Sequence, residues 1–337
     1  MRRLSTVAAL IVALGLMGAC SQEPEVDPVE QAWADFRAAY GELEATEAKA
    51  ELIEAFLREQ PDTTYAGMLA PALAYYRGDE LGEPAAAHAL LAETRAANTD
   101  PEARFQIGTA MFPLAVELGE EMDLGSVAAE LAAARPLDFG EKIDVADLAV
   151  EHGRWETGAE YAEAALAEAT PEAFLADYPD EDYTQPEAVA KAERRRVMAL
   201  ADLGWALWNL DRKEEAQAAF DQAMTLRSAD YVGASDTKLD LYAGRAALAA
   251  GEPERAMELL APSAVMGSDS DAMAAYREAY VTARGSEQGI DEHLWSVREQ
   301  LAKPVDDFTL TDYEGEAHSF SALTDGKVAL LAFWFPT

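Results

Sequence analysis

The feature that most constrains this chain is a long run of helical periodicity. From Val29 to about Lys303, apolar residues recur three and four positions apart. Breaks rich in proline, glycine and aspartate interrupt this pattern at residues 60–62, 82–84, 99–101, 135–136, 170–171, 180–181 and 251–253. These breaks predict helices of about ten to twenty residues joined by short turns. No alternating pattern typical of a β-strand precedes residue 305, so we expect a mostly α fold.

Composition supports this expectation and excludes some functions. Roughly a fifth of the residues are alanine, which favours helices and lets them pack closely. The chain has 26 Lys+Arg against 63 Asp+Glu, a formal net charge of -37. Such a charge repels a polyanion, so we expect no nucleic-acid partner. We interpret the acid excess as solvated helix faces; a negative surface that binds a basic partner or cations is the alternative.

Two segments share one spacing of small and large residues. Counted from a glycine, the matching residues follow at 12, 16 and 19 positions in both segments. The two sets are Gly204, Ala216, Phe220 and Ala223, and Gly244, Ala256, Leu260 and Ser263. A weaker third set is Ala146, Gly158, Ala162 and Ala165. We expect turns at 210–212, 250–252 and 152–153, and antiparallel helices that approach closely at the small residues. The larger residue at the third position should fill the space towards the neighbour.

This pattern resembles the tetratricopeptide repeat (TPR), a helix-turn-helix unit. The resemblance is good for residues 200–226 and 240–263, fair for 143–169, and only degenerate for 30–134. The three units start 58 and 40 residues apart, whereas the repeat has a regular spacing of about 34 residues. The resemblance implies an irregular α-solenoid over residues 31–303 whose concave face binds proteins or peptides. The alternative is that these helices only space the C-terminal segment.

The N-terminus has the layout of a signal peptide. Arg2 and Arg3 precede a short apolar stretch over 4–17, and small residues lead to Cys20. This ending resembles the lipobox of bacterial lipoproteins. The resemblance implies cleavage after residue 19, acylation of Cys20 and a lipid-anchored tether over 20–30; Ser21 would favour the periplasmic face of the outer membrane. Removing residues 1–19 takes away two arginines and no acids, which gives a charge of -39. The alternative is a secretory signal with an incidental cysteine.

The last segment, residues 304–337, changes character. Phe308 and Leu310 alternate with polar residues before a Tyr-Glu-Gly turn, which predicts a short β-hairpin. The apolar run over 328–335 predicts a strand buried on both faces. The pattern resembles the start of a thioredoxin-fold redoxin of the TlpA/ResA type, and the peroxiredoxins are a near relative. The matching residues are Asp307, Phe308, Leu310, Asp312, Gly315, Ser319, Leu323, Gly326, Lys327, Phe333 and Trp334.

The redoxin resemblance implies thiol-disulfide exchange with extracytoplasmic client proteins. In that group the first cysteine of Cys-x-x-Cys follows four residues after the tryptophan, one position past Thr337. Cys20 is the sole cysteine, so the given chain has no redox pair and we expect it to be catalytically inert. We expect a truncated α/β thioredoxin-like segment. The alternatives are a non-enzymatic lipid-anchored adaptor with a vestigial tail and a peroxiredoxin-like parent.

Metal and cofactor sites are not indicated. His88, His152, His293 and His318 are scattered and share no metal-ligand spacing, so we expect no metal site. No phosphate-binding loop, catalytic triad or other cofactor motif is present. The expected partners are therefore proteins or peptides, bound by the helical repeats, and a membrane, bound through the lipid at Cys20.

Overall fold

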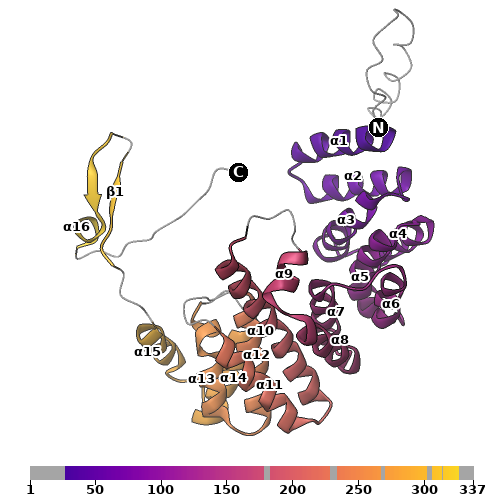
Figure 1. Ribbon diagram of the computed structural model, residues 1–337. Helices are drawn as coiled ribbons and strands as arrows, with labels where there is room; N and C mark the ends of the chain where they lie inside the picture. Colours follow the sequence, from indigo (N-terminus) through magenta and orange to yellow (C-terminus); the bar gives the residue numbers. More distant parts are fainter. Residues whose placement is uncertain are drawn as a thin grey trace, which may run out of the picture. The chain divides into compact units, whose positions relative to one another are not determined.

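The computed structural model describes residues 27–177, 183–227, 234–266, 270–301, 306–312 and 314–325 (Figure 1). Over these residues the chain is mostly α-helical, and its strands lie after residue 305, as predicted. The predicted strand at 328–335 and the predicted signal peptide fall outside the described residues. Contacts divide the chain into two compact units, residues 1–189 and 190–337, where the sequence predicted one helical domain over 31–303.

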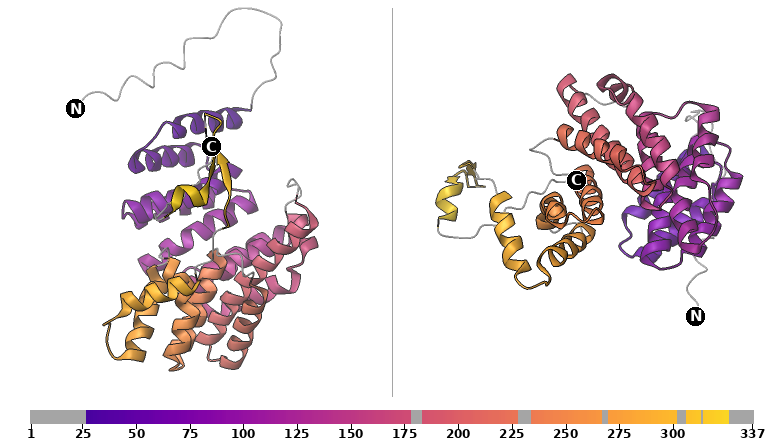
Figure 2. Two further views of the ribbon diagram at one scale, coloured as in Figure 1. Left: turned by 90° about the vertical axis from the view of Figure 1, so that its left-hand side faces the viewer. Right: turned by 90° about the horizontal axis from the view of Figure 1, so that it is seen from below.

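The first unit is built from helices that pack mainly against their neighbours in sequence (Figures 1 and 2). They are α1 (Pro28–Gly41), α2 (Thr46–Glu59), α3 (Thr64–Leu73), α4 (Pro84–Ala97), α5 (Pro101–Leu118), α6 (Leu124–Ala134), α7 (Phe139–Glu151), α8 (Trp155–Glu168) and α9 (Pro171–Asp177). A π-helical segment, η1 (Ala74–Glu80), lies between α3 and α4. Helix α1 begins inside the segment predicted as a tether, so the helices start three residues earlier than expected.

Aspartate caps explain why several helices begin where they do. The side chains of Asp27, Asp100, Asp123 and Asp138 each accept a hydrogen bond from a backbone N–H in the first turn. At α7 the cap is reciprocal, because the Glu141 side chain accepts a bond from the Asp138 N–H at 2.9 Å. Such caps satisfy donors that have no partner within the helix. Acidic residues at the breaks therefore fix the helix boundaries.

The segment η1 was not anticipated from the sequence, and its side chains hold it in place. Arg77 donates to Glu54 on α2 at 2.6 Å and to Glu83 at 2.9 Å. Gly78 lies under α5, where a Cβ atom would be 2.6 Å from Leu114 Cδ2. The wide turn thus seats a residue without a side chain against α5. Contacts from three neighbouring segments, rather than a local sequence signal, stabilise this geometry.

Helix α10 (Gln185–Asn209) begins in the last residues of the first unit, and most of it belongs to the second unit. The helices α11 (Lys213–Leu226), α12 (Ala234–Ala249), α13 (Pro253–Met266), α14 (Ser270–Arg284) and α15 (Ile290–Leu301) follow. Strands β1 (Thr309–Thr311) and β2 (Ala317–Ser319) form an antiparallel hairpin, as predicted, and α16 (Phe320–Thr324) follows it. Helix α10 has 25 residues and α9 has 7, so the predicted range of helix lengths was too narrow.

The glycine-centred spacing corresponds to close contacts between paired helices. A Cβ atom at Gly204 on α10 would be 2.5 Å from Phe220 on α11. Gly244 on α12 is covered in the same way by Leu260 on α13. In the weaker set, Gly158 on α8 lies against Val150 on α7, also at 2.5 Å. The predicted close approach is confirmed for all three pairs. Phe220 and Leu260 fill the space over the glycine of their own pair, whereas in the weaker set Val150, which lies outside the predicted spacing, takes this place.

The turns of these three pairs share one backbone conformation. Seven residues after the first position of each set, the φ angle is positive: 70° at Gly153, 61° at Asp211 and 81° at Gly251. This left-handed conformation ends the first helix and starts the turn, and it favours glycine. All three turns lie where the sequence predicted them. Among these three turns, the one between α10 and α11 has Asp211 rather than glycine at this position.

Candidate functional site

Five of the twelve residues predicted for lipidation or for the redoxin pattern lie outside the described residues. Cys20, the predicted lipidation site, is outside the described residues, as are Gly326, Lys327, Phe333 and Trp334 of the redoxin pattern. Among the helices in the described part of the chain, none combines the length and apolarity that a membrane crossing requires. The described residues that match the redoxin pattern cluster on the hairpin and on α16.

Each of several redoxin-pattern residues has a local structural task. Asp307 accepts hydrogen bonds from the backbone N–H and the hydroxyl of Ser321, both at 2.8 Å. These bonds hold the pKa of Asp307 below its ordinary value. Phe308 stacks on Phe320, with ring centroids 4.8 Å apart. Ser319 accepts a bond from the Ala322 N–H and so caps α16. These contacts close the hairpin on α16.

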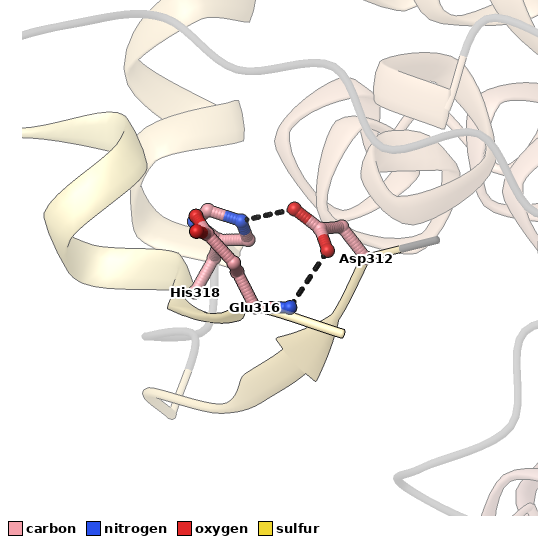
Figure 3. Close-up of side chains that lie close together, drawn as sticks. All are labelled: Asp312, Glu316 and His318. Carbon is pink, nitrogen blue, oxygen red and sulfur yellow. Dashed lines mark hydrogen bonds and ion pairs between the residues drawn. The ribbon is translucent and has the colours of Figure 1, made fainter. Parts of the chain in front are cut away.

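Asp312 organises the hairpin turn and meets two other possible metal ligands (Figure 3). Oδ1 of Asp312 accepts hydrogen bonds from the backbone N–H groups of Glu314, at 3.0 Å, and Glu316, at 2.8 Å. Oδ2 of Asp312 lies 2.7 Å from His318 Nε2. The bond to His318 is the largest cause that lowers the pKa of Asp312. One potential ligand atom from each of Asp312, Glu316 and His318 lies within 4.8 Å of the others.

This hairpin group is explained by the turn itself. Gly315 has a φ of 89°, and both oxygens of Asp312 are engaged by the turn and by His318. The three side chains are half-buried or exposed, and three ligands are fewer than the four typical of structural zinc. Spacing alone did not predict the approach of His318 to two acids, because the turn between them creates it. The other histidines lie elsewhere: His152 packs on Phe112 and His293 on Tyr280.

A groove in the first unit has the properties of a binding surface. It has a volume of about 420 Å³ and lies over α5, with α3 on one side and α7 on the other. Its floor contains Phe105 and Ala110, which are 7% and 8% exposed, and half-buried Leu148 lies beside them. The lining is completed by polar and charged residues and one proline: Pro71, Glu102, Gln106, Thr109, Arg135, Glu141, Asp144, Asp147 and Glu151.

Arg135, the cationic side chain that lines the groove, is paired with two glutamates. Arg135 donates to Glu102 at 2.8 Å and to both carboxylate oxygens of Glu141, at 2.6 and 2.9 Å. The hydrogen bonds to Glu141 are the largest cause that raises the pKa of Arg135, and those to Glu102 add to it. Arg135 thereby ties the start of α5 to the start of α7 beside the groove.

The groove as a whole is strongly acidic. Five carboxylates and one guanidinium line it, which gives a formal net charge of -4. Four of these acids, Glu141, Asp144, Asp147 and Glu151, come from α7, where they are three or four positions apart and share one face. Like charges three or four positions apart on one helix repel each other.

Sequence reasoning missed this groove, although one signal was present. Acids at 141, 144, 147 and 151 have helical spacing and surround Leu148. In a chain with 63 acids, such a stripe does not stand out. It becomes distinctive because Phe105 and Ala110 of α5 supply an apolar floor beside it. No family model matches this chain, and no curated protein matches it either.

Proposed function

We propose that this chain is a lipid-anchored envelope protein of the TlpA-like thiol-disulfide oxidoreductase type, whose helical units bind protein partners. The observation that carries the binding role is the groove over α5, with a buried apolar floor and charged walls. Binding sites of this kind combine apolar contact area with a few polar groups that orient the ligand. The close helix pairs at Gly158, Gly204 and Gly244 support the TPR-like reading of the helices.

The redoxin part of the proposal is supported by the hairpin. The residues that match the redoxin pattern at 307–319 make the contacts that close the hairpin on α16. Because Cys20 is the sole cysteine and serves as the acylation site, the chain as given carries out no thiol-disulfide exchange. In this proposal its helices position clients or partners on the periplasmic face of the outer membrane.

A non-enzymatic adaptor is the second candidate function. The observation in its favour is that the groove over α5 and the close helix pairs need no redox thiol to bind a protein. The adaptor and the redoxin readings share the anchor and the protein-binding groove. They differ in whether a Cys-x-x-Cys pair acts with the helical units.

Photo-crosslinking in cells tests the shared binding role. A photoreactive benzoylphenylalanine replaces Gln106, an exposed residue of the groove, and in a matched control replaces Glu160, an exposed residue of α8 outside it. We expect protein adducts from position 106 and none of the same size from position 160. Equal adducts from both positions, or none from either, would contradict a protein-binding role for the groove.

A further inference from the structure

We propose that the apolar face of the β1–β2 hairpin packs on the last two turns of α15, so that the second unit holds the C-terminal segment through this contact. The inference goes beyond the proposed function, because it depends neither on the groove over α5 nor on the lipid at Cys20. Three observations lead to it: an exposed apolar face on the hairpin, an uncovered apolar stripe on α15, and a short chain connection between them.

One face of the hairpin is apolar. Leu310 pairs with His318 across the strands, and the Phe320 N–H donates to the Phe308 carbonyl at 2.8 Å, which extends this pairing. Alternate residues of a strand, and residues directly opposite in a pair, point to the same side. Phe308, Leu310 and Phe320 therefore share one side, which we call the hairpin face. Phe308 and Phe320 are half-buried, and Leu310 is 62% exposed.

A hairpin of this size needs a partner on that face. Each of its strands has three residues, and α16 has five. A two-stranded hairpin alone is marginally stable at best in water, and packing against a helix is one way to stabilise it. Covering Leu310 also removes apolar surface from water. We therefore expect the hairpin face to lie on a longer apolar surface.

The apolar stripe of α15 is longer than the part that is covered. Four residues share one side of this helix at spacings of three and four: Ile290, Leu294, Val297 and Leu301. The first two are buried, the third is half-buried and Leu301 is 47% exposed. Arg298 donates to the Val265 carbonyl at 2.9 Å, in the last turn of α13. Helix α13 thus ends beside Arg298, and Leu301 lies one turn further on.

Trp295 and Arg298 widen this uncovered surface. Trp295, Arg298 and Leu301 are three positions apart, so each lies one turn from the next. The Arg298 guanidinium is 5.4 Å from the centre of the Trp295 ring, and Trp295 is 59% exposed. The aliphatic stem of Arg298 therefore continues the apolar surface from Trp295 to Leu301. This end of α15 offers a helix surface of the kind that the hairpin face needs.

The chain connection favours a contact within one molecule. Four residues, 302–305, separate Leu301 from Asp306, so their Cα atoms are at most about 18 Å apart. Leu310 lies four residues further on, which adds about 13 Å in an extended strand and allows it to return over α15. Closing so short a loop loses less entropy than the association of two separate molecules does. The hairpin of the same chain is thus favoured over that of a second copy.

Photo-crosslinking of the purified full chain in detergent tests the contact. Benzoylphenylalanine replaces Leu310, and in a matched control replaces Thr309, which lies on the opposite face of β1. Both positions are tethered to α15 equally, so tethering alone gives equal yields. We expect adducts with residues of α15, located by tandem mass spectrometry, at a yield at least fivefold higher from position 310 than from position 309.

A mixture of chains labelled with ¹⁴N and ¹⁵N identifies the occupant of the hairpin face. We expect each adduct to join residues of the same isotope. Adducts mainly between the two isotopes would assign the face to a second copy, and adducts mainly on residues 328–335 would assign it to that segment. Either result, equal yields from positions 309 and 310, or no adduct on α15 would overturn the proposal.

Hydrogen exchange measures whether the contact stabilises the hairpin. Leu301→Asp puts a charge on the uncovered stripe, and Gln300→Asp puts the same charge on the neighbouring exposed residue, off the stripe. We expect the amides of β1 and β2 to exchange at least tenfold faster than in the wild type in Leu301→Asp, and within about twofold in Gln300→Asp. Equal exchange in the two variants would overturn the proposal.

The reciprocal variant keeps the test valid if Leu301→Asp perturbs α15 itself. Leu310→Asp leaves every residue of α15 in place, and Thr309→Asp is its control on the opposite face of the strand. We expect the amides of residues 298–301 to exchange at least tenfold faster than in the wild type in Leu310→Asp, and within about twofold in the control. Unchanged exchange in Leu310→Asp would overturn the proposal.

Discussion

At the scale of single residues, the turn positions show how one backbone conformation is specified. Gly153 and Gly251 adopt a positive φ without strain, and Asp211 adopts it with a side chain. Asp211 is almost fully exposed, and its pairing with Lys213 at 3.7 Å adds little stability. The left-handed strain of Asp211 therefore costs more free energy of folding than its pairing with Lys213 contributes.

Replacing Asp211 with glycine should stabilise the second unit. We expect Asp211→Gly to raise the free energy of unfolding by about 0.5–1 kcal/mol, because glycine removes the left-handed strain. The matched change Gly251→Ala should lower it by about 1 kcal/mol, because alanine introduces that strain. Urea unfolding of both variants measures the two effects. Stability changes of the same sign in both would contradict this account of the turn.

Tyr40 gives the first unit a dependence on alkaline pH. Its hydroxyl lies 2.8 Å from that of Tyr76, and burial, followed by this hydrogen bond, raises the pKa of Tyr40 from 10.0 to about 12. The folded protein thus binds the phenol proton more tightly than the unfolded chain does. The resulting stability is present below pH 10 and is lost as the pH rises from 10 to about 12.

The variant Tyr40→Phe isolates this contribution. We expect its free energy of unfolding to fall less steeply than that of the wild type between pH 10 and about 12, because the raised pKa is gone. Denaturant unfolding at a series of pH values, with phenolate absorbance as a second reading, makes the comparison. A variant that loses stability as steeply as the wild type would refute the assignment.

At the scale of elements, one glutamate joins three helices. Glu130 on α6 accepts hydrogen bonds from Arg95 on α4 and from Arg104 on α5. The bond from Arg104 is the largest cause that lowers the pKa of Glu130 below its ordinary value. Arg104 also donates to the Arg95 carbonyl at 2.8 Å, so the two arginines brace each other. The network therefore holds α4, α5 and α6 against one another.

This network predicts a dependence on acidic pH. Because the folded-state pKa of Glu130 is depressed, its stabilising effect is present above the ordinary pKa of 4.5 and is lost as the pH falls below that value. We expect Glu130→Gln to lower stability at neutral pH by about 1 kcal/mol, after allowing for solvent screening, and to flatten the acid-induced decline. Glu93→Gln, at an exposed position of α4, is the control. Equal behaviour of both variants would contradict the network.

The elements also mark the limit of prediction from sequence. Prolines, glycines and capping aspartates are local signals, so most helix boundaries and the three turns could be predicted. The contacts of Gly204 and Gly244 followed from their spacing to Phe220 and Leu260. Three features could not be predicted, because each depends on residues brought together by the fold: the π-helical η1, the meeting of Asp312 with His318, and the groove over α5.

At the scale of the whole molecule, part of the excess of acidic residues lies in the lining of the groove over α5. A formal charge of -37 over the chain first indicated solvated helix faces, with a basic partner as the alternative. In the first unit, four of these acids, Glu141, Asp144, Asp147 and Glu151 of α7, line the groove over α5. Solvated helix faces and a basic partner both stay interpretations of this charge excess.

We propose that the helical units act while held at a membrane by a lipid on Cys20. Metabolic labelling with a radioactive fatty acid, followed by membrane fractionation, tests it most directly. We expect the wild-type chain to be labelled and to remain with the membranes, and Cys20→Ala to be unlabelled and released. Ser21→Ala, which keeps the thiol, should behave as the wild type. Label that persists in Cys20→Ala, or a Cys20→Ala protein that stays with the membranes, would contradict the claim.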